Sequence, residues 1–364
     1  MTLIVAVQHR QGAFDLDVDF RSDGRLTALF GPSGSGKSTI VNLIAGLARP
    51  DRGRIAIGDQ VLVDTAAGVF LPPYKRRIGY VFQDSRLFPH LTVSQNLRYG
   101  RWFTPARERY ADFDAVVGML GIGHLLDRRP AMLSGGEKSR VAIGRALLAS
   151  PRLILMDEPF ASLDEARKAE IFPYLERLRD ESEIPIVYVS HSIAEVARLA
   201  TDVVVLSEGR VSASDPASAI LAQPGLMPPE ERGEAGALID LVMTNPDDGF
   251  GLSLLTSSGG EWRLPKIDAT AGARLRVRVR ARDVMLAVTR PQGISALNVL
   301  EGRVAAIAEA GRTETVVTVH AGDDILAARI TRRSVEQLAL TPGSKVYALI
   351  KSVTLEQART APSA

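Results

Sequence analysis

Residues 31–38 read Gly-Pro-Ser-Gly-Ser-Gly-Lys-Ser, a spacing of glycines, lysine and hydroxyl that suits a phosphate chain. The glycines let backbone N–H groups curl around phosphates, and a following helix adds the positive end of its dipole. Lys37 would reach the terminal phosphates, and the Ser38 hydroxyl would ligate Mg²⁺. An apolar run over 26–30 and a helical pattern over 39–47 flank the loop, which favours a nucleotide site over an ordinary glycine turn. The expected nucleotide-binding residues are Gly31, Pro32, Ser33, Gly34, Ser35, Gly36, Lys37, Ser38 and Thr39.

Two acidic residues follow the wholly apolar run 153–156 and would complete a site for phosphoryl transfer. Such a run predicts a buried strand, and ligands of α/β sheets bind at the carboxyl ends of strands. Asp157 would hold Mg²⁺ through water, and Glu158 would polarise the attacking water. Without the glycine loop, the same pattern would fit a strand followed by a helix cap equally well.

A third motif, Ser134, Gly135, Gly136 and Glu137, precedes a helical pattern over 138–148. Serine and glutamate at this spacing form a capping box, so a well-made helix start is one interpretation. Two consecutive glycines would also expose backbone amides at the helix N-terminus, which favours a second phosphate site.

The elements that must position these motifs differ between the two parts of the chain. Residues 1 to about 212 alternate β-branched runs, such as 78–82 and 203–206, with amphipathic stretches, such as 170–179, which predicts an α/β fold with a largely parallel sheet. A segment rich in proline and glycine, 215–236, indicates a domain boundary, and short alternating runs after it predict small β-barrels. We expect an α/β P-loop NTPase domain over 1–232 with a helical part at about 84–150, a β-rich part over 233–290 and an OB-type β-domain over 291–356.

Composition excludes several classes of protein. With 46% hydrophobic and 24% charged residues among 364, the chain can bury sizeable cores, and disorder is excluded. The net charge of +2 and the absence of cysteine give no reason to expect a nucleic-acid surface, a disulfide or a thiolate metal site. No run reaches the roughly 18 apolar residues of a membrane helix, so we expect membrane contact only through a partner. Arginines alternate over 274–282 and would occupy one solvated strand face.

Six motifs in this order resemble the nucleotide-binding domain of ATP-binding cassette (ABC) transporters. They are the loop at 31–38, Gln83, the LSGGE sequence at 133–137, the strand 153–157 with Glu158, the Ser162-Leu163-Asp164 turn, and His191 after the apolar run 186–189. The resemblance implies ATP and Mg²⁺ as ligands. It gives Gln83 a role at the γ-phosphate, the metal and the membrane partner, Asp164 a role beside the nucleotide, and His191 a catalytic role with Lys37 and Glu158. It also implies a head-to-tail homodimer, or a pairing with another cassette, in which the LSGGE sequence of one partner closes over the ATP of the other.

The same resemblance implies an aromatic platform for adenine before the loop. Phe14 is the candidate, although a core position would suit it equally. Residues 70–93 resemble the importer branch and, within it, the ATPases of molybdate importers, where the region after Gln83 receives a permease helix. The tail, with Ser295, Lys351 and Ser352 as candidate ligands, resembles the Mop (TOBE) module that binds molybdate, although Leu297 stands where arginine is frequent. The other interpretation of the tail is a dimerisation barrel that binds no ion.

These observations predict an ATPase subunit on the cytoplasmic side of the inner membrane. It would drive a separate permease that imports molybdate or tungstate from an external oxyanion-binding protein, with no nucleic-acid partner. One alternative is an importer of the same architecture for sulfate, iron or a sugar. Two further alternatives are an ABC protein of DNA repair or translation, whose usual heptad insertion or basic arm is missing from this sequence, and an oxyanion sensor that represses transport.

Overall fold

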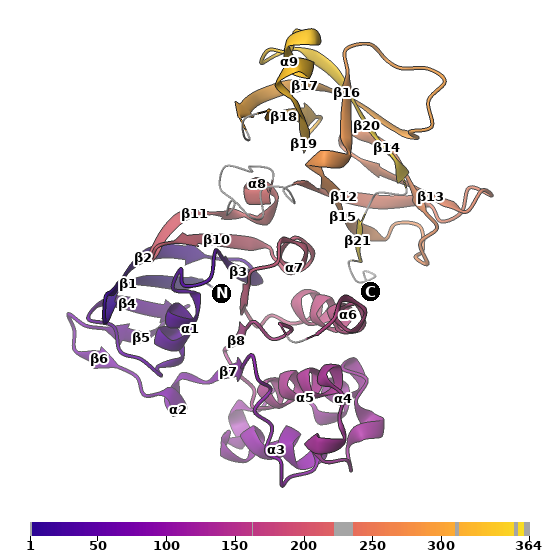
Figure 1. Cartoon of the computed structure of the whole chain (residues 1–364). Helices are drawn as coiled ribbons and strands as arrows, with labels where there is room; N and C mark the ends of the chain where they lie inside the picture. The colour runs from indigo at the N-terminus through magenta and orange to yellow at the C-terminus, as the bar shows by residue number, and fades with distance from the viewer. Residues whose placement is uncertain (1, 162, 222–235, 310–312, 353–355, 360–364) are drawn as a thin grey trace. The chain divides into compact units, whose positions relative to one another are not determined.

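The computed structural model describes the chain except residues 1, 162, 222–235, 310–312, 353–355 and 360–364 (Figure 1). The chain divides into two compact units. The first comprises Met1–His191 with Leu199–Ser214, and the second comprises Ser192–Arg198 with Asp215–Ala364. The boundary expected at residue 232 lies outside the described residues, and the predicted domain limits stay predictions.

An eleven-stranded sheet runs through the first unit in the order β6-β5-β4-β1-β2-β11-β10-β3-β9-β8-β7. The strands from β10 to β7 pair in parallel, whereas β1, β2, β4, β5 and β6 pair with their neighbours as antiparallel strands except where β2 meets β11. The strands are β1 (Leu3–Gln11), β2 (Phe14–Ser22), β3 (Leu26–Phe30), β4 (Arg52–Ile57), β5 (Gln60–Asp64), β6 (Val69–Phe70), β7 (Ile78–Val81), β8 (Leu153–Asp157), β9 (Ile186–Ser190), β10 (Asp202–Ser207) and β11 (Arg210–Pro216).

The central strands are buried on both faces because helices cover them. All five residues of β3 and of β9 are buried, the continuous apolar pattern expected of parallel strands between helix layers. Helices α3, α4 and α5 gather beside β7, and α5 packs against that strand (Figure 1). The helices of the first unit are α1 (Lys37–Ala45), α2 (Pro73–Arg76), α3 (Val93–Phe103), α4 (Phe113–Met119), α5 (Gly135–Leu148) and α6 (Glu165–Glu181). Those of the second unit are α7 (Ile193–Leu199), whose last residue belongs to the first unit, α8 (Ala217–Leu221) and α9 (Arg332–Gln337).

A fully buried arginine closes the C-terminal end of α1. Arg76 donates hydrogen bonds to the carbonyls of Leu43 and Ile44 at 2.8 and 2.7 Å and to that of Leu71 at 2.6 Å. Burial lowers the pKa of its guanidinium to about 10. Gly46 follows the helix with φ 80°, and a Cβ there would lie 2.6 Å from Arg76 Cζ, so this position requires glycine. The arginine thus gives donors to carbonyls at the helix end, where the Leu43 carbonyl also accepts from the Gly46 N–H at 3.2 Å, and places a cation at the negative end of the helix dipole.

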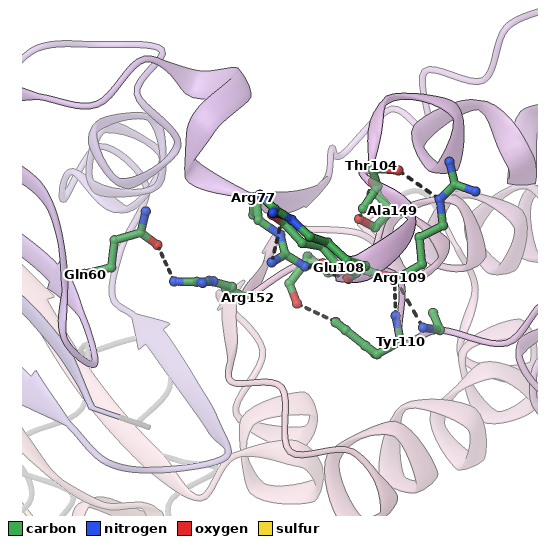
Figure 2. Close-up of polar contacts among 12 residues, drawn as sticks. Gln60, Arg77, Thr104, Glu108, Arg109, Tyr110, Ala149 and Arg152 are labelled. Atoms are coloured by element: carbon green, nitrogen blue, oxygen red, sulfur yellow. Dashed lines mark hydrogen bonds and ion pairs between the residues drawn. The ribbon is translucent and has the colours of Figure 1, made fainter.

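A second arginine, Arg77, joins the group of helices α3, α4 and α5 to the sheet, near the connection from α5 to β8. Arg77, in the left-handed conformation, pairs with Glu108 at 3.1 Å and donates to the carbonyl of Ser150 at 2.7 Å (Figure 2). The Thr104 hydroxyl donates to the carbonyl of Ala149 at 2.9 Å. The connection from α5 to β8 is therefore held from both sides by side chains.

The second unit is almost entirely antiparallel β-structure with one shared core. Its sheets have the orders β14-β13-β12-β15-β21 and β16-β20-β17-β18-β19, and apolar residues of both sheets form one cluster around the fully buried Trp262. The second sheet curls until β16 and β19 meet. The strands are β12 (Gly236–Asn245), β13 (Leu252–Ser257), β14 (Gly260–Pro265), β15 (Arg274–Arg280), β16 (Val284–Ala287), β17 (Asn298–Glu309), β18 (Glu314–Ala321), β19 (Asp324–Thr331), β20 (Lys345–Ile350) and β21 (Glu356–Arg359).

The predicted fold class, α/β followed by all-β, is confirmed, and two details differ from expectation. One of the short alternating runs that the sequence shows after residue 236, residues 275–288, forms two strands, because a turn at Ala281–Asp283 sends β15 and β16 into different sheets. The arginine face of β15 is not uniformly solvated either. Arg278 is only 6% exposed, in a strand that pairs with β12 on one side and β21 on the other.

Replacing Arg76 by methionine should destabilise the first unit. The variant keeps most of the apolar volume but removes the Arg76 hydrogen bonds to three backbone carbonyls, and we expect the free energy of unfolding to fall by about 3 kcal/mol. The melting temperature of the first unit should then fall by roughly 6 to 12 °C in calorimetric scans. The neighbouring exposed residue gives the control: Lys75→Met should melt within about 2 °C of the parent chain. Equal melting of the two variants would contradict the role assigned to Arg76.

Candidate functional site

The four groups that the sequence predicts at the nucleotide all follow neighbouring parallel strands. The strand order β3-β9-β8-β7 places the phosphate loop, His191, the acidic pair and Gln83 side by side at one edge of the sheet. The register aligns Phe30 with Ser190 and Val189 with Asp157. The carboxyl ends of these strands therefore lie together, at the edge where ligands bind in α/β sheets.

The loop after β3 is shaped around the Lys37 ammonium group. Its Nζ donates to the carbonyls of Gly31 and Pro32 at 2.7 and 2.8 Å, and the side chain is buried. Burial lowers the lysine pKa, while Glu158 and Asp157 oppose that shift. Gly31 approaches the next strand so closely that a Cβ would lie 2.2 Å from the Leu206 carbonyl oxygen. Glycine at this position is therefore a packing requirement as well as a source of flexibility.

The first turn of α1 is open to an anion. Its N-cap is Gly36, and no side chain caps the helix. Orphan N–H groups together with the positive end of the helix dipole form an anion site at a helix start. The Ser35 hydroxyl is buried without a hydrogen-bond partner. These donors fit the phosphate chain that the sequence predicts.

Ser38 and Asp157 form the oxygen pair expected of a magnesium site. The Ser38 hydroxyl donates to Asp157 Oδ1 at 3.1 Å, and the Tyr80 hydroxyl reaches Asp157 Oδ2 at 3.4 Å and Asn42 at 3.3 Å. Burial raises the pKa of Asp157, nearby Glu158 raises it further, and the bonds from Ser38 and Tyr80 lower it. Among the described residues no group of three or more acids, histidines or cysteines could hold a metal ion. Two protein oxygens fit Mg²⁺, which in such sites takes its other ligands from water and phosphates.

Glu158 and His191 follow the neighbouring strands β8 and β9, and their side chains lie close together. His191 Nδ1 lies 3.5 Å from Glu158 Oε1, and the Glu158 backbone N–H donates to the Val189 carbonyl at 3.2 Å. Glu158 has φ 44°, a left-handed conformation that is uncommon for a residue with a side chain. Backbone strain of this kind concentrates at functional sites. The geometry gives the carboxylate a fixed direction beside the phosphate loop.

A cavity of about 500 Å³ opens over the loop and includes the predicted adenine platform. Phe14 begins β2, is half-buried, and lies against Gly36, where a Cβ would come within 3.2 Å of its ring. Phe14 therefore both packs and lines the cavity, which keeps it a candidate for stacking on the base. The cavity is lined by Gln11, Phe14, Ser33, Gly34, Gly36, Lys37, Ser38, Thr39 and Glu158.

The LSGGE residues lie at the start of α5, away from this cavity. The Ser134 hydroxyl accepts from the Glu137 N–H at 3.3 Å, and the Glu137 carboxylate accepts from the Ser134 N–H at 2.7 Å. The predicted capping box is therefore present, and the bond from the Ser134 backbone lowers the pKa of Glu137. Gly135 lines a second cavity of about 500 Å³ together with Gln83. Within one chain, Gln83 therefore lies near the start of α5, whereas the phosphate loop lines a different cavity.

Two of the remaining predicted residues, Asp164 and Ser352, have local hydrogen-bond partners. Asp164 caps α6 by accepting from the Arg167 N–H at 2.9 Å, while Ser162 lies outside the described residues. In the second unit, Ser352 is buried and its hydroxyl accepts from Asn298 at 3.3 Å, whereas Ser295 and Lys351 are exposed. The Asn298 side chain also accepts from the Arg263 backbone N–H and donates to the Arg263 carbonyl. These two hydrogen bonds join β14 to β17.

Comparison with known proteins agrees with this geometry. The ABC transporter family matches residues 15–161, and the TOBE domain matches residues 294–355. The molybdenum import ATP-binding protein of Mesorhizobium japonicum is 58% identical over 99% of this chain and 97% of its own length. That of Rhizobium etli is 55% identical over 98% of this chain and 100% of its own. This chain belongs to the ABC transporter family. A solved ATP-binding subunit of an ABC transporter shares 28% identity with it at a TM-score of 0.52, covering 62% of this chain and 94% of that one.

Family membership accounts for most of the site but not for all of the side chains that hold it. Tyr80, Asn42 and Gln11 contact the site or line its cavity, and the sequence offered no signal for them beyond proximity to a motif. Tyr80 precedes Gln83 by three residues, and in the structure it stacks on Phe82 with ring centroids 3.9 Å apart. In the part of the chain that the structure describes, no helix is long and apolar enough to cross a membrane.

Replacing Tyr80 by phenylalanine should weaken metal binding at Asp157. The change removes a hydrogen bond worth about 0.5–1.5 kcal/mol to a group that orients a metal ligand. We expect the Mg²⁺ concentration that half-saturates ATP hydrolysis to rise about threefold to tenfold, with little loss of stability. Tyr174→Phe, which removes a hydroxyl that contacts Arg140 instead, serves as the control. An unchanged Mg²⁺ requirement in Tyr80→Phe would exclude the role of this hydroxyl.

Proposed function

We propose that this chain is the ATP-hydrolysing subunit of an importer for molybdate, or for the chemically similar tungstate. The observation that carries the proposal is the combination of an open phosphate-loop cavity with similarity to molybdenum import ATP-binding proteins over almost the whole chain. Membership of the ABC family accounts for ATP binding and hydrolysis. The identity of the transported oxyanion rests on the relatives.

The proposed chemistry is transfer of the γ-phosphoryl group of ATP to water. Such transfer depends mainly on position and on stabilisation of charge, and less on covalent chemistry by the protein. Lys37 and the open first turn of α1 would bind the phosphates, and Phe14 would stack on adenine. Ser38 and Asp157 would hold Mg²⁺, which when bound would neutralise phosphate charge. Glu158 would orient the attacking water and accept its proton, while His191 would fix the carboxylate that lies 3.5 Å away.

A head-to-tail homodimer would complete the site. In one chain, Gly135 and the phosphate loop line different cavities, so the amides at the start of α5 do not face the loop of their own copy. In the dimer, the start of α5 of one copy would lie over the ATP of the other, with Asp164 nearby. ATP binding would then close the dimer, and hydrolysis would reopen it.

The proposed membrane partner is inferred from the cavity that Gln83 and Gly135 line. Leu87 and Pro89 line the cavity beside Gln83, which suits an apolar helix from a membrane permease. The chain would then be peripheral, on the cytoplasmic side of the membrane, with an external oxyanion-binding protein delivering the solute. In the tail, Ser295, Lys351 and Ser352 stay candidates for molybdate, since hydroxyls and an ammonium group suit a tetrahedral dianion.

Glu158→Gln should separate ATP binding from turnover. The amide cannot accept a proton, so we expect the hydrolysis rate to fall by at least about a hundredfold while the Kd for ATP stays within about twofold. Sedimentation should then reveal a dimer that requires ATP. Adding Ser134→Arg should abolish that dimer without loss of ATP binding, whereas Asp112→Ala, which removes the cap of another helix, should leave it intact. Undiminished hydrolysis in Glu158→Gln would overturn the proposal.

Calorimetric titration of the full chain with molybdate and with sulfate tests the solute and the tail together. We expect saturable heat with molybdate, little with sulfate, and at least about tenfold weaker binding in Lys351→Ala because a charge-assisted bond is lost. Arg303→Ala, on β17, provides a basic-residue control. Failure of molybdate to bind would exclude an oxyanion site in the tail. Uptake by vesicles containing the assembled transporter would then decide between molybdate and another solute.

A further inference from the structure

The segment that follows β7 carries Gln83 and crosses from the sheet to α3. Its first residues fold back on themselves, because the Arg86 guanidinium lies over the Phe82 ring at 4.1 Å and Arg86 has φ 43°. Its far end is fastened to α3 by the fully buried Asn96, which accepts from the Phe88 N–H at 2.9 Å and donates to the Phe88 carbonyl at 3.1 Å. The middle of the segment is held by a different helix.

Arg145, on α5, holds that middle part. Its two terminal nitrogens donate to consecutive backbone carbonyls, Arg86 at 2.8 Å and Ser85 at 3.1 Å, and its guanidinium lies 5.3 Å from the centre of the Phe88 ring. Burial lowers the pKa of this half-buried arginine. A planar guanidinium can bridge two carbonyls in a fixed orientation, which a single ammonium does less well.

The position of Arg145 links two functional elements of one chain. Helix α5 begins with the LSGGE glycines, and Lys138, seven residues before Arg145, lies on the same face of the helix and lines the cavity that contains Gln83. The last residue of β7 is Val81, and the first carbonyl that Arg145 holds is that of Ser85. Three residues lie between them, and Gln83 is the middle one. The reach of Gln83 is therefore limited by the sheet on one side and by α5 on the other.

We propose that Arg145 is a positioning residue for Gln83. Its two bonds to the segment fix Gln83 relative to the start of α5, so that the γ-phosphate contact and the LSGGE helix move together. The inference rests on the proposed role of Gln83 at the nucleotide. Because Arg145 lies on α5 and does not line the phosphate-loop cavity, its loss should change turnover and leave the affinity for ATP unaltered.

A double-mutant cycle on the full chain tests the proposal. Arg145→Met should lower kcat for ATP hydrolysis by about tenfold or more, since a small misplacement of a catalytic group is costly, with KM and the Kd for ATP within about twofold. Arg145→Lys should recover part of that loss. In a Gln83→Ala background, Arg145→Met should change kcat by less than about twofold, because the group it positions is gone.

The control comes from the same helix. Arg140 bonds the Leu120 carbonyl and the Tyr174 hydroxyl, away from the segment, so Arg140→Met should change kcat by the same factor with and without Gln83. An equal loss from Arg145→Met in both backgrounds would overturn the inference while leaving the role of Gln83 intact. An unchanged kcat in Gln83→Ala alone would overturn both.

A second measurement does not depend on catalysis. The chain contains no cysteine, so Asp84→Cys offers a single site for a nitroxide label beside Gln83. We expect the label to become more mobile when Arg145→Met is added, while a label at Asp114→Cys on α4 should keep its spectrum. An unaltered spectrum at position 84 would show that Arg145 does not hold the segment, and the proposal would fail.

Discussion

The register of four parallel strands is the constraint on which the site depends. Each of β3, β9, β8 and β7 ends in a functional group, and the ladder between them places the ends of the strands at one edge of the sheet. Because side chains alternate faces along a strand, a slip of one residue in β8 would turn Asp157 to the wrong side. The wholly buried β3 and β9 hold this register by packing on both faces.

Arginines maintain the arrangement around that edge. Arg76 ends the phosphate-loop helix, Arg77 joins the sheet to the connection after α5, and Arg145 holds the segment that contains Gln83. All three donate to backbone carbonyls at places where helix or strand hydrogen bonding stops. A long, planar cation with five donors is suited to such ends, and partial burial makes the loss of its bonds costly. The helical group is therefore fastened to the sheet by a few directed contacts.

The second unit follows a different physical rule. Its two sheets share one apolar core, and polar ties such as Asn298 with Arg263 lie between strands of different sheets. The alternating arginines in β15 illustrate how far side-chain exposure can be predicted from sequence alternation. Alternation separates the two faces of a strand, yet whether the polar face meets water depends on what packs over that face in the folded protein, as the buried Arg278 demonstrates.

The sequence alone determined the chemistry of the first unit. Glycine spacing, Lys37, Ser38, the acidic pair and the capping box are local features, and local geometry follows from a few consecutive residues. The fold class was predictable for the same reason, since hydrophobic periodicity is also local. Only the tertiary structure decided that His191 faces Glu158, that Tyr80 reaches Asp157, and that Arg145 holds Ser85 and Arg86. These contacts join residues far apart in the chain, and strand order and helix packing, which bring them together, are not encoded in any short stretch of sequence.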